Sequence, residues 1–247
     1  KKISVIIGNP PYSAKQSSAN DNAANLSYKN LDKQIEKTYA AESMATNKHA
    51  LYDSYLRAFK WASERIGDEG VIGFVTNAGY IDGNATDGFR KSLNKEFSKI
   101  YIFHLRGDQR TSGERSRKEG GKIFGSGSRA PIAISILVKK ENHSEKNKIY
   151  FSDIGDYLDR EQKLAKISDY KSIGGIEQKG RFSLIEPDEE NDWVNQIDKS
   201  FKKFPVLGNK KDKNCDSLFK NYSLGVNTGR DAWSYNFSQQ EIKNNIQ

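Results

Sequence analysis

Asn9, Pro10, Pro11 and Tyr12 follow a short apolar run near the start of the chain, and their types and order suit the binding of a flat amino group. The Asn9 side chain carries a carbonyl that accepts a hydrogen bond. The Pro10 carbonyl can face the same way, because the two prolines restrict the backbone. Two acceptors match the two hydrogens of an NH2 group, and stacking on the Tyr12 ring is worth about 1–3 kcal/mol for a base. These four residues therefore predict a socket for an amino group on a planar ring.

Such a socket would activate a poor nucleophile. The amino nitrogen of adenine has a lone pair that is delocalised into the ring, and acceptors that draw on both hydrogens favour a pyramidal nitrogen with a localised lone pair. That effect stabilises the transition state more than the ground state. Residues 3–7 predict a buried strand that ends at Gly8. In an open α/β sheet, the loop after such a strand lies at the edge where ligands bind.

The tetrapeptide N-P-P-Y at residues 9–12 resembles the catalytic motif of S-adenosylmethionine-dependent methyltransferases that modify amino groups, above all the DNA adenine-N6 enzymes. An ordinary Asn-Pro turn is the alternative, although composition predicts an Asn/Asp-Pro-Pro-aromatic string by chance in only about one chain in two hundred of this length. The resemblance implies that Asn9 and Pro10 hold the amino group beside the cofactor, that Pro11 restrains the loop, and that Tyr12 stacks on the base. It also implies that the adenine leaves the duplex.

Composition supports a nucleic-acid partner. The chain has 247 residues, 29% of them charged, with a formal net charge of +8. A basic balance points to a polyanion, whereas a lysine-rich solvated surface is the alternative. The single cysteine, Cys215, excludes an internal disulfide and a cysteine-rich zinc site, and the three histidines lack metal-ligand spacing, so we expect no metal. No membrane-spanning run or signal peptide is visible, and we expect a cytoplasmic protein without a membrane partner.

The apolar pattern predicts alternating strands and helices. Strands are expected at 71–76, 99–105 and 131–140, and helices at 49–66 and 87–97. The polar segment 13–47, with a weak helical stretch at 31–44, predicts a loop or lid over the substrate, or else a surface insertion. An apolar stripe runs along the first helix: Leu51, Tyr55, Phe59, Ala62 and Ile66.

A basic, glycine-rich stretch at 106–129 separates two of the expected strands. Arginines on a flexible loop suit contacts with a phosphate backbone, and a solvated surface is the alternative. The resemblance implies that the strand at 131–140 is the reversed last strand of the methyltransferase sheet, and that Phe124 packs against the flipped base. Phe124 could equally anchor the loop. The candidate DNA-backbone contacts are Arg106, Arg110, Arg115, Arg117, Lys118, Lys122 and Arg129.

After residue 140 we expect a strand at 148–154, a helix at 160–167, and a helix at 188–204 with Trp193, Val194, Ile197 and Phe201 on one face. The tail, including Arg230, Trp233, Tyr235 and Phe237, resembles the segment that joins methyltransferase to target-recognition domain in type ISP restriction-modification enzymes. Those enzymes also carry nuclease and helicase regions on the same chain. The tail aromatics could contact nucleic acid or pack, and we favour packing.

The resemblance implies the C-terminal half of a Rossmann-like S-adenosylmethionine-dependent methyltransferase sheet with an antiparallel last strand, over residues 1–140. A smaller α+β extension, 141–247, leads towards a target-recognition domain. No strand-glycine-helix pattern precedes Asn9, so the main cofactor site is expected to be absent, and the chain alone to bind S-adenosylmethionine poorly and to be inactive. The expected partners are double-stranded DNA and the N-terminal nuclease, helicase and cofactor-binding regions of the same polypeptide.

Two other functions fit the same residues. Glutamine side-chain methyltransferases use the same motif, because an amide is also a planar NH2 group, although the basic charge favours DNA. The chain could also be a DNA-binding module that transfers no methyl group.

Overall fold

The computed structural model of the chain describes residues 3–11, 28–125, 129–140, 147–196, 198, 200, 203–209, 212, 214–223, 225, 229 and 231–246. The chain divides into two compact units, Lys1–Gln196 and Ile197–Gln247, and each is considered by itself. Residues 12–27, which include Tyr12 and the first part of the expected lid, lie outside the described residues.

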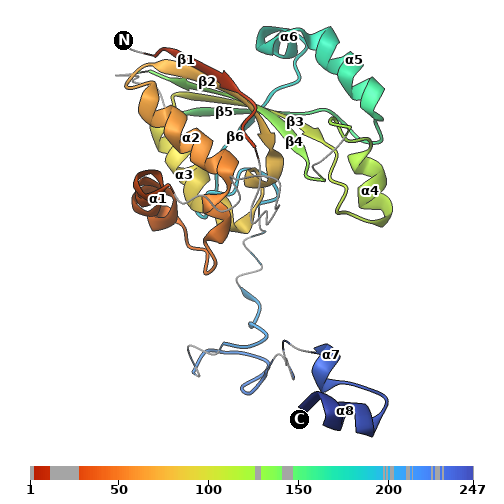
Figure 1. Cartoon of the computed structure of the whole chain (residues 1–247). Coiled ribbons are helices and arrows are strands. Elements are labelled where there is room, and N and C mark those ends of the chain that lie inside the picture. The colour runs from red at the N-terminus through yellow and green to blue at the C-terminus, as the bar shows by residue number, and fades with distance from the viewer. Residues whose placement is uncertain are drawn as a thin grey trace. The chain divides into compact units, whose positions relative to one another are not determined.

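The first unit is built on a six-stranded mixed sheet in the order β1-β2-β4-β3-β5-β6 (Figure 1). β1 is parallel to β2, β3 is parallel to β5, and β4 runs antiparallel to both β2 and β3. This arrangement confirms a methyltransferase-type α/β sheet with a reversed strand, which was predicted at 131–140. The strands are β1 (Val5–Gly8), β2 (Gly70–Asn77), β3 (Lys99–Arg106), β4 (Ile132–Lys139), β5 (Lys148–Asp153) and β6 (Ser183–Ile185).

Helices cover the two faces of the sheet. One face packs on α1 (Lys29–Ile35), the π-helical turn η1 (Glu36–Ala40), the 3-10 turn η2 (His49–Tyr52), α2 (Ser54–Arg65) and α3 (Asp87–Glu96). All five members of the predicted stripe from Leu51 to Ile66 are buried there, which confirms that prediction. The α-helix itself begins only at Ser54, because the Asp53 side chain caps it by accepting the N–H of Tyr55 at 3.4 Å.

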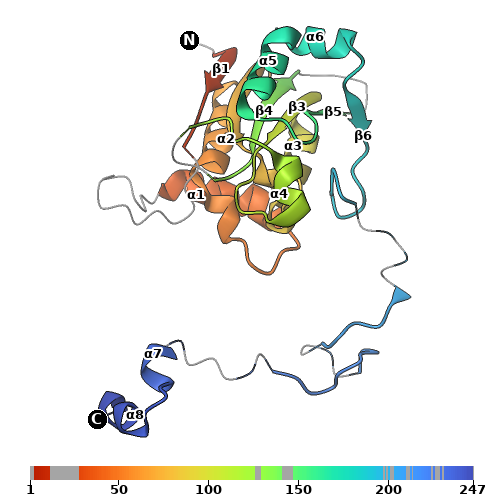
Figure 2. The same ribbon diagram turned by 90° about the vertical axis from the view of Figure 1, so that its right-hand side faces the viewer.

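The opposite face carries a smaller core made by β3, β4 and the helices α5 (Arg160–Tyr170) and α6 (Ile173–Gln178). Both views place α5 and α6 across the sheet from α1 (Figures 1 and 2). α5 begins with a capping box between Asp159 and Gln162, in which each side chain accepts the backbone N–H of the other residue. A seven-residue helix, α4 (Gly113–Glu119), lies in the connection between β3 and β4.

Two predictions about burial were wrong. β1 is not buried: the Val5 and Ile7 side chains are 57% and 82% exposed, because β1 pairs with β2 on one side and with no described strand on the other. The segment 28–44 is not merely a surface insertion or lid, since α1 and η1 bury Ile35 and Tyr39 completely in the core.

The helix expected at 188–204 does not begin at its predicted start: described residues 188–196 are not helical, and 3-10 geometry is found only at 200 and 203 among the described residues of this range. The Asp188 carboxylate accepts the backbone N–H groups of Glu190 and Asp192 at 3.0 and 2.8 Å, which makes a turn in place of a first helical turn. Ile197 and Phe201 lie outside the described residues. β5 and β6 continue the same sheet, so the first compact unit extends past residue 140 to Gln196. The functional division at residue 140 stays a prediction.

The second unit contains α7 (Asp231–Ser234), α8 (Gln239–Ile246) and an isolated bridge between Val206 and Ser217. Trp233, Tyr235 and Phe237 are exposed in this unit, which does not support the packing role that we favoured, and Arg230 is not among the described residues. No helix in the described parts of the chain has the length and apolar composition that crossing a membrane requires. The first unit also contains two 3-10 turns between β2 and α3, η3 (Ala78–Tyr80) and η4 (Asn84–Thr86).

Candidate functional site

Four strands end at one edge of the sheet. β1, β2, β3 and β5 all point in the same direction, because β4 is antiparallel to both β2 and β3. β4 starts at that edge, since Ile132 is paired with both Asn77 and Arg106. The loop after β1, the turn after β2 and the long connection from β3 to β4 therefore meet at the carboxyl edge, as predicted for the loop at residues 9–11.

The Asn9 loop begins where β1 ends. The last register pair of β1 joins Gly8 to Phe74, and a Cβ on Gly8 would come within 3.3 Å of the Phe74 ring. Asn9 and Pro11 are exposed and Pro10 is half-buried. No other described residue hydrogen-bonds to the Asn9 side chain, so its carbonyl is free to accept a donor from a ligand. The placement of Tyr12, the fourth predicted member, is outside the described residues.

A rigid turn follows β2 beside this loop. The Asn77 side-chain oxygen accepts the N–H of Gly79 at 2.8 Å, and the Ala78 N–H donates to the carbonyl of Pro131 at 2.8 Å. Tyr80 is buried with its hydroxyl against Ser135 of β4, and burial raises its pKa far above the ordinary value. The neutral Tyr80 side chain thus attaches the segment that follows β2 to the neighbouring strand β4.

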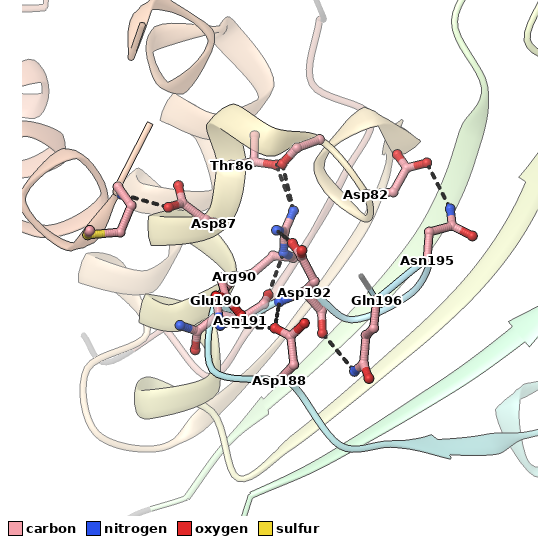
Figure 3. Close-up of polar contacts among 12 residues, drawn as sticks. Asp82, Thr86, Asp87, Arg90, Asp188, Glu190, Asn191, Asp192, Asn195 and Gln196 are labelled. Atoms are coloured by element: carbon pink, nitrogen blue, oxygen red, sulfur yellow. Dashed lines mark hydrogen bonds and ion pairs between the residues drawn. The ribbon is translucent and has the colours of Figure 1, made fainter. Parts of the chain in front are cut away.

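Arg90, a residue that the sequence analysis missed, holds this segment through hydrogen bonds of its guanidinium group, which lies between Thr86 and Asp192 (Figure 3). Its side chain is fully buried on α3. One terminal nitrogen, Nη1, donates to the carbonyls of Tyr80 and Gly83 at 3.1 and 2.8 Å, and Nη2 forms an ion pair with Asp192. Burial lowers the pKa of Arg90, whereas the negative charge of Asp192 opposes that shift. The signal in the sequence that could have revealed Arg90 was a charged residue close to the apolar Phe89 and Leu93 in the expected helix.

The segment that contains Asp192 is thereby fastened to the turn after β2. Trp193 is only 3% exposed and packs edge-on against Tyr80, with ring centroids 6.3 Å apart. Residues 188–196 are the last part of the first unit. The end of this unit is therefore bound to the same element that borders the carboxyl edge.

The predicted basic loop is more ordered than a flexible glycine-rich stretch. Arg106 has a φ of 56°, and its Nε donates to both Asp153 oxygens at 2.8 and 2.9 Å while Nη1 contacts Asp156. Burial disfavours the Asp153 carboxylate, but hydrogen bonds from His104 and the Gly155 N–H, with the charge of Arg106, outweigh it and lower its pKa. The Arg106 guanidinium is thus engaged within the protein.

The other basic candidates differ in their engagement. Arg110 pairs with Asp108, Arg117 pairs with Glu114 at 3.3 Å, and Arg129 donates to the carbonyl of Gln109 at 2.8 Å. Arg115 and Lys118 are exposed, Lys122 is half-buried, and none of these three forms an ion pair with a described residue. A contact between any of the seven cations and DNA stays a prediction.

Phe124 is half-buried and packs against the smaller core on the α5 face. It precedes β4 at the carboxyl edge, where a base-packing residue was expected, and its core contact equally fits the alternative of a loop anchor. Both roles remain predictions. Within the described ranges, His, Cys, Asp and Glu side chains do not gather in a group of three that could hold a metal ion.

The fold and the position of residues 9–11 define the class of the first unit, a methyltransferase-type α/β domain. Residues 1–110 match the family model of the Eco57I restriction-modification methylase. No match to a curated protein was found.

Three solved structures of longer chains resemble the chain over nearly its whole length. The ATP-dependent Type ISP restriction-modification enzyme LlaBIII, bound to DNA, is 45% identical with a TM-score of 0.87, over 98% of this chain and 16% of that chain. A nuclease-deletion mutant of the Type ISP enzyme LlaGI, in complex with a DNA substrate mimic, is 50% identical with a TM-score of 0.87, over 100% and 19%. The DrdV–DNA complex is 35% identical with a TM-score of 0.85, over 100% and 24%.

The chain belongs to the methyltransferase domain of Type ISP restriction-modification enzymes and spans less than a quarter of the length of these relatives.

Proposed function

We propose that this chain is the catalytic-loop half of a methyltransferase that transfers a methyl group from S-adenosylmethionine to N6 of adenine in DNA. The observation that carries the proposal is the position of Asn9, Pro10 and Pro11. They follow β1 at the carboxyl edge of a methyltransferase sheet, with the Asn9 side chain exposed and free of partners among the described residues. The residues fit an amino-group socket, because two carbonyl acceptors are the chemistry that an exocyclic amine requires.

The protein's contribution to the reaction is electrostatic and geometric. The Asn9 side-chain carbonyl and the Pro10 carbonyl accept the two hydrogens of the amine and localise its lone pair. Pro11 restrains the loop so that little reorganisation is needed, and Tyr12 stacks on the base. S-adenosylmethionine would supply an electrophilic methyl group when bound, and Asn9 is the residue of this chain that would contact it. Holding the nitrogen in line with that methyl group supplies much of the remaining rate.

Double-stranded DNA is the proposed substrate. LlaBIII is bound to DNA, LlaGI is in complex with a DNA substrate mimic, and DrdV is a DNA complex. The net charge of +8 supports the same partner. Because adenine N6 is inaccessible to this loop within a duplex, the base must be flipped out. Phe124 is the proposed second packing residue for the flipped base.

The proposed functional unit is a longer polypeptide. The relatives have chains more than four times as long as the matched region. We propose that other regions of the polypeptide supply the main cofactor site, with nuclease and helicase regions, and that residues 141–247 lead to target recognition. The isolated chain should therefore bind S-adenosylmethionine weakly, and tight one-to-one binding in a calorimeter would contradict this.

The test of the catalytic role replaces Asn9 in the full-length polypeptide. Single-turnover methylation of duplex DNA should fall by about 10²–10³-fold in Asn9→Ala, as for loss of one preorganised transition-state contact. The matched control is Asn30→Ala, which makes the same change at an exposed position of α1. Equal rates in the two variants would remove Asn9 from the reaction.

A further inference from the structure

Helix α4 carries a cluster of exposed cations at the carboxyl edge. It lies in the connection that leaves the end of β3 and returns to the start of β4, the same edge at which Asn9 is found. Arg115, Arg117 and Lys118 are all exposed on its seven residues. Glu114 pairs with Arg117 at 3.3 Å and offsets its charge, but both side chains are more than half exposed, so the pair adds little stability and Arg117 can exchange it for another anion.

The carboxyl end of α4 is docked on the loop before α5. The Tyr157 N–H donates to the carbonyl of Lys118 at 3.2 Å, and the Gly121 N–H donates to that of Leu158 at 2.9 Å. Gly120 has a φ of 66°, and a Cβ there would lie 2.0 Å from the Leu158 oxygen. Only glycine permits this approach, so the sequence Gly120-Gly121 serves to bring two backbones together.

Lys163 of α5 stabilises this contact between the end of α4 and the loop before α5. The residue is fully buried, and its Nζ donates to the carbonyls of Glu119 and Gly121, each at 2.7 Å. Arg160, one turn earlier, donates through Nε to the carbonyl of Ile123 at 2.9 Å. A buried ammonium is costly to desolvate, and here it binds the backbone on both sides of the glycine that ends α4.

We propose that α4 is a rigid docking surface for the phosphate backbone of DNA beside the target base, with Lys163 as the residue that positions it. The proposal rests on the DNA-methylating function and names the contact surface for that substrate. Of the three α4 cations, Arg115 and Lys118 form no ion pair with a described residue, so they are available to phosphates without breaking an internal salt bridge. A docked helix presents them without the entropy cost of ordering a loop.

The first experiment measures DNA binding by the full-length polypeptide without S-adenosylmethionine. The double variant Arg115→Ala/Lys118→Ala should lower affinity for a duplex by on the order of tenfold and reduce the slope of log K against log salt by about 1.8, at about 0.9 per phosphate. Lys33→Ala/Lys37→Ala removes the same charge from exposed positions on α1 and η1, across the sheet from α5, and should leave the slope unchanged. Equal slopes in the two double variants would overturn the proposal.

The second experiment tests the positioning role of Lys163. Lys163→Met should weaken DNA binding severalfold, Lys163→Arg should restore part of it, and Lys166→Met is the control because Lys166 bonds the carbonyl of Ile154 instead. In the Arg115→Ala/Lys118→Ala background, Lys163→Met should have little further effect. A full additive loss in that background would show that Lys163 does not act through α4.

The two proposals can fail separately. A wild-type salt slope in the α4 double variant overturns the docking surface, whatever Asn9→Ala does to methylation. A reduced slope together with undiminished adenine methylation by Asn9→Ala supports the surface and overturns the catalytic assignment.

Discussion

The Nε–H of Arg90 donates to the backbone carbonyl of Asn191 across 2.7 Å, although 101 residues separate the two in sequence. The same guanidinium binds carbonyls of the turn after β2, so one side chain joins the carboxyl edge of the sheet to the last segment of the first unit. The arrangement satisfies a buried charge with several fixed acceptors, which is the condition for tolerating it in a protein interior.

Arg90→Ala should lower the free energy of unfolding by about 3–5 kcal/mol, because it leaves Asp192 and several carbonyls without their donor. Arg90→Lys should recover little of this, since an ammonium lacks the planar fork. Urea denaturation is the measurement. Arg57→Ala is the control: its Nε lies 2.7 Å from Asp32, but both side chains are partly exposed, and about 1 kcal/mol or less should be lost. Comparable losses in the two alanine variants would contradict this account.

Gly88→Ala and Gly174→Ala should have opposite effects although both glycines lie in helices. Alanine in a helix ordinarily gains about 1 kcal/mol over glycine. At Gly88 of α3, however, a Cβ would lie 2.0 Å from the Tyr39 carbonyl oxygen, whereas at Gly174 of α6 its nearest neighbour is Ser172 Oγ at an ordinary 3.6 Å. Thermal unfolding should show a lower Tm for Gly88→Ala and an equal or higher Tm for Gly174→Ala. A raised Tm in both would show that α3 can move away from η1.

The stability of the first unit should depend on Lys163 at alkaline pH. Burial lowers the pKa of this lysine from 10.5 to about 8. Between these values the unfolded chain binds more protons, so this residue's contribution to the free energy of unfolding rises with pH. Below about pH 8 the cost of burying its charge is present in full. The difference in unfolding free energy between wild type and Lys163→Met should therefore increase from pH 8 to 9.5, and a flat difference would contradict the lowered pKa.

Local patterns in the sequence were sufficient for much of the sheet and for the helices that line it. The spacing from Leu51 to Ile66 predicted a buried helical face, and the apolar runs predicted β2, β3, β4 and β5, because those signals depend on neighbours in sequence. The stop at Gly8 and the following prolines likewise predicted the loop at the carboxyl edge. The candidate site could be anticipated to that extent.

The remaining features depend on distant contacts that periodicity does not encode. Trp193 and Val194 looked like one face of a helix, but the Asp188 turn and the pairing of Asp192 with Arg90 fix a different backbone. α4 has no apolar face from which a helix could be predicted, because backbone hydrogen bonds near Leu158 hold its carboxyl end in place. β1 is exposed because it lies at the end of the strand order, and the apolar residues of β1 do not indicate the position of the strand in the sheet.

The central claim is that residues 9–12 activate the amino group of adenine. The most direct measurement incubates the full-length polypeptide with methyl-labelled S-adenosylmethionine and mixed-sequence duplex DNA, digests the DNA to nucleosides, and identifies the labelled one. We expect label in N6-methyladenine that is lost in Asn9→Ala and retained in Asn30→Ala. Label in another nucleoside, label in protein glutamine, or adenine label that survives Asn9→Ala would contradict it.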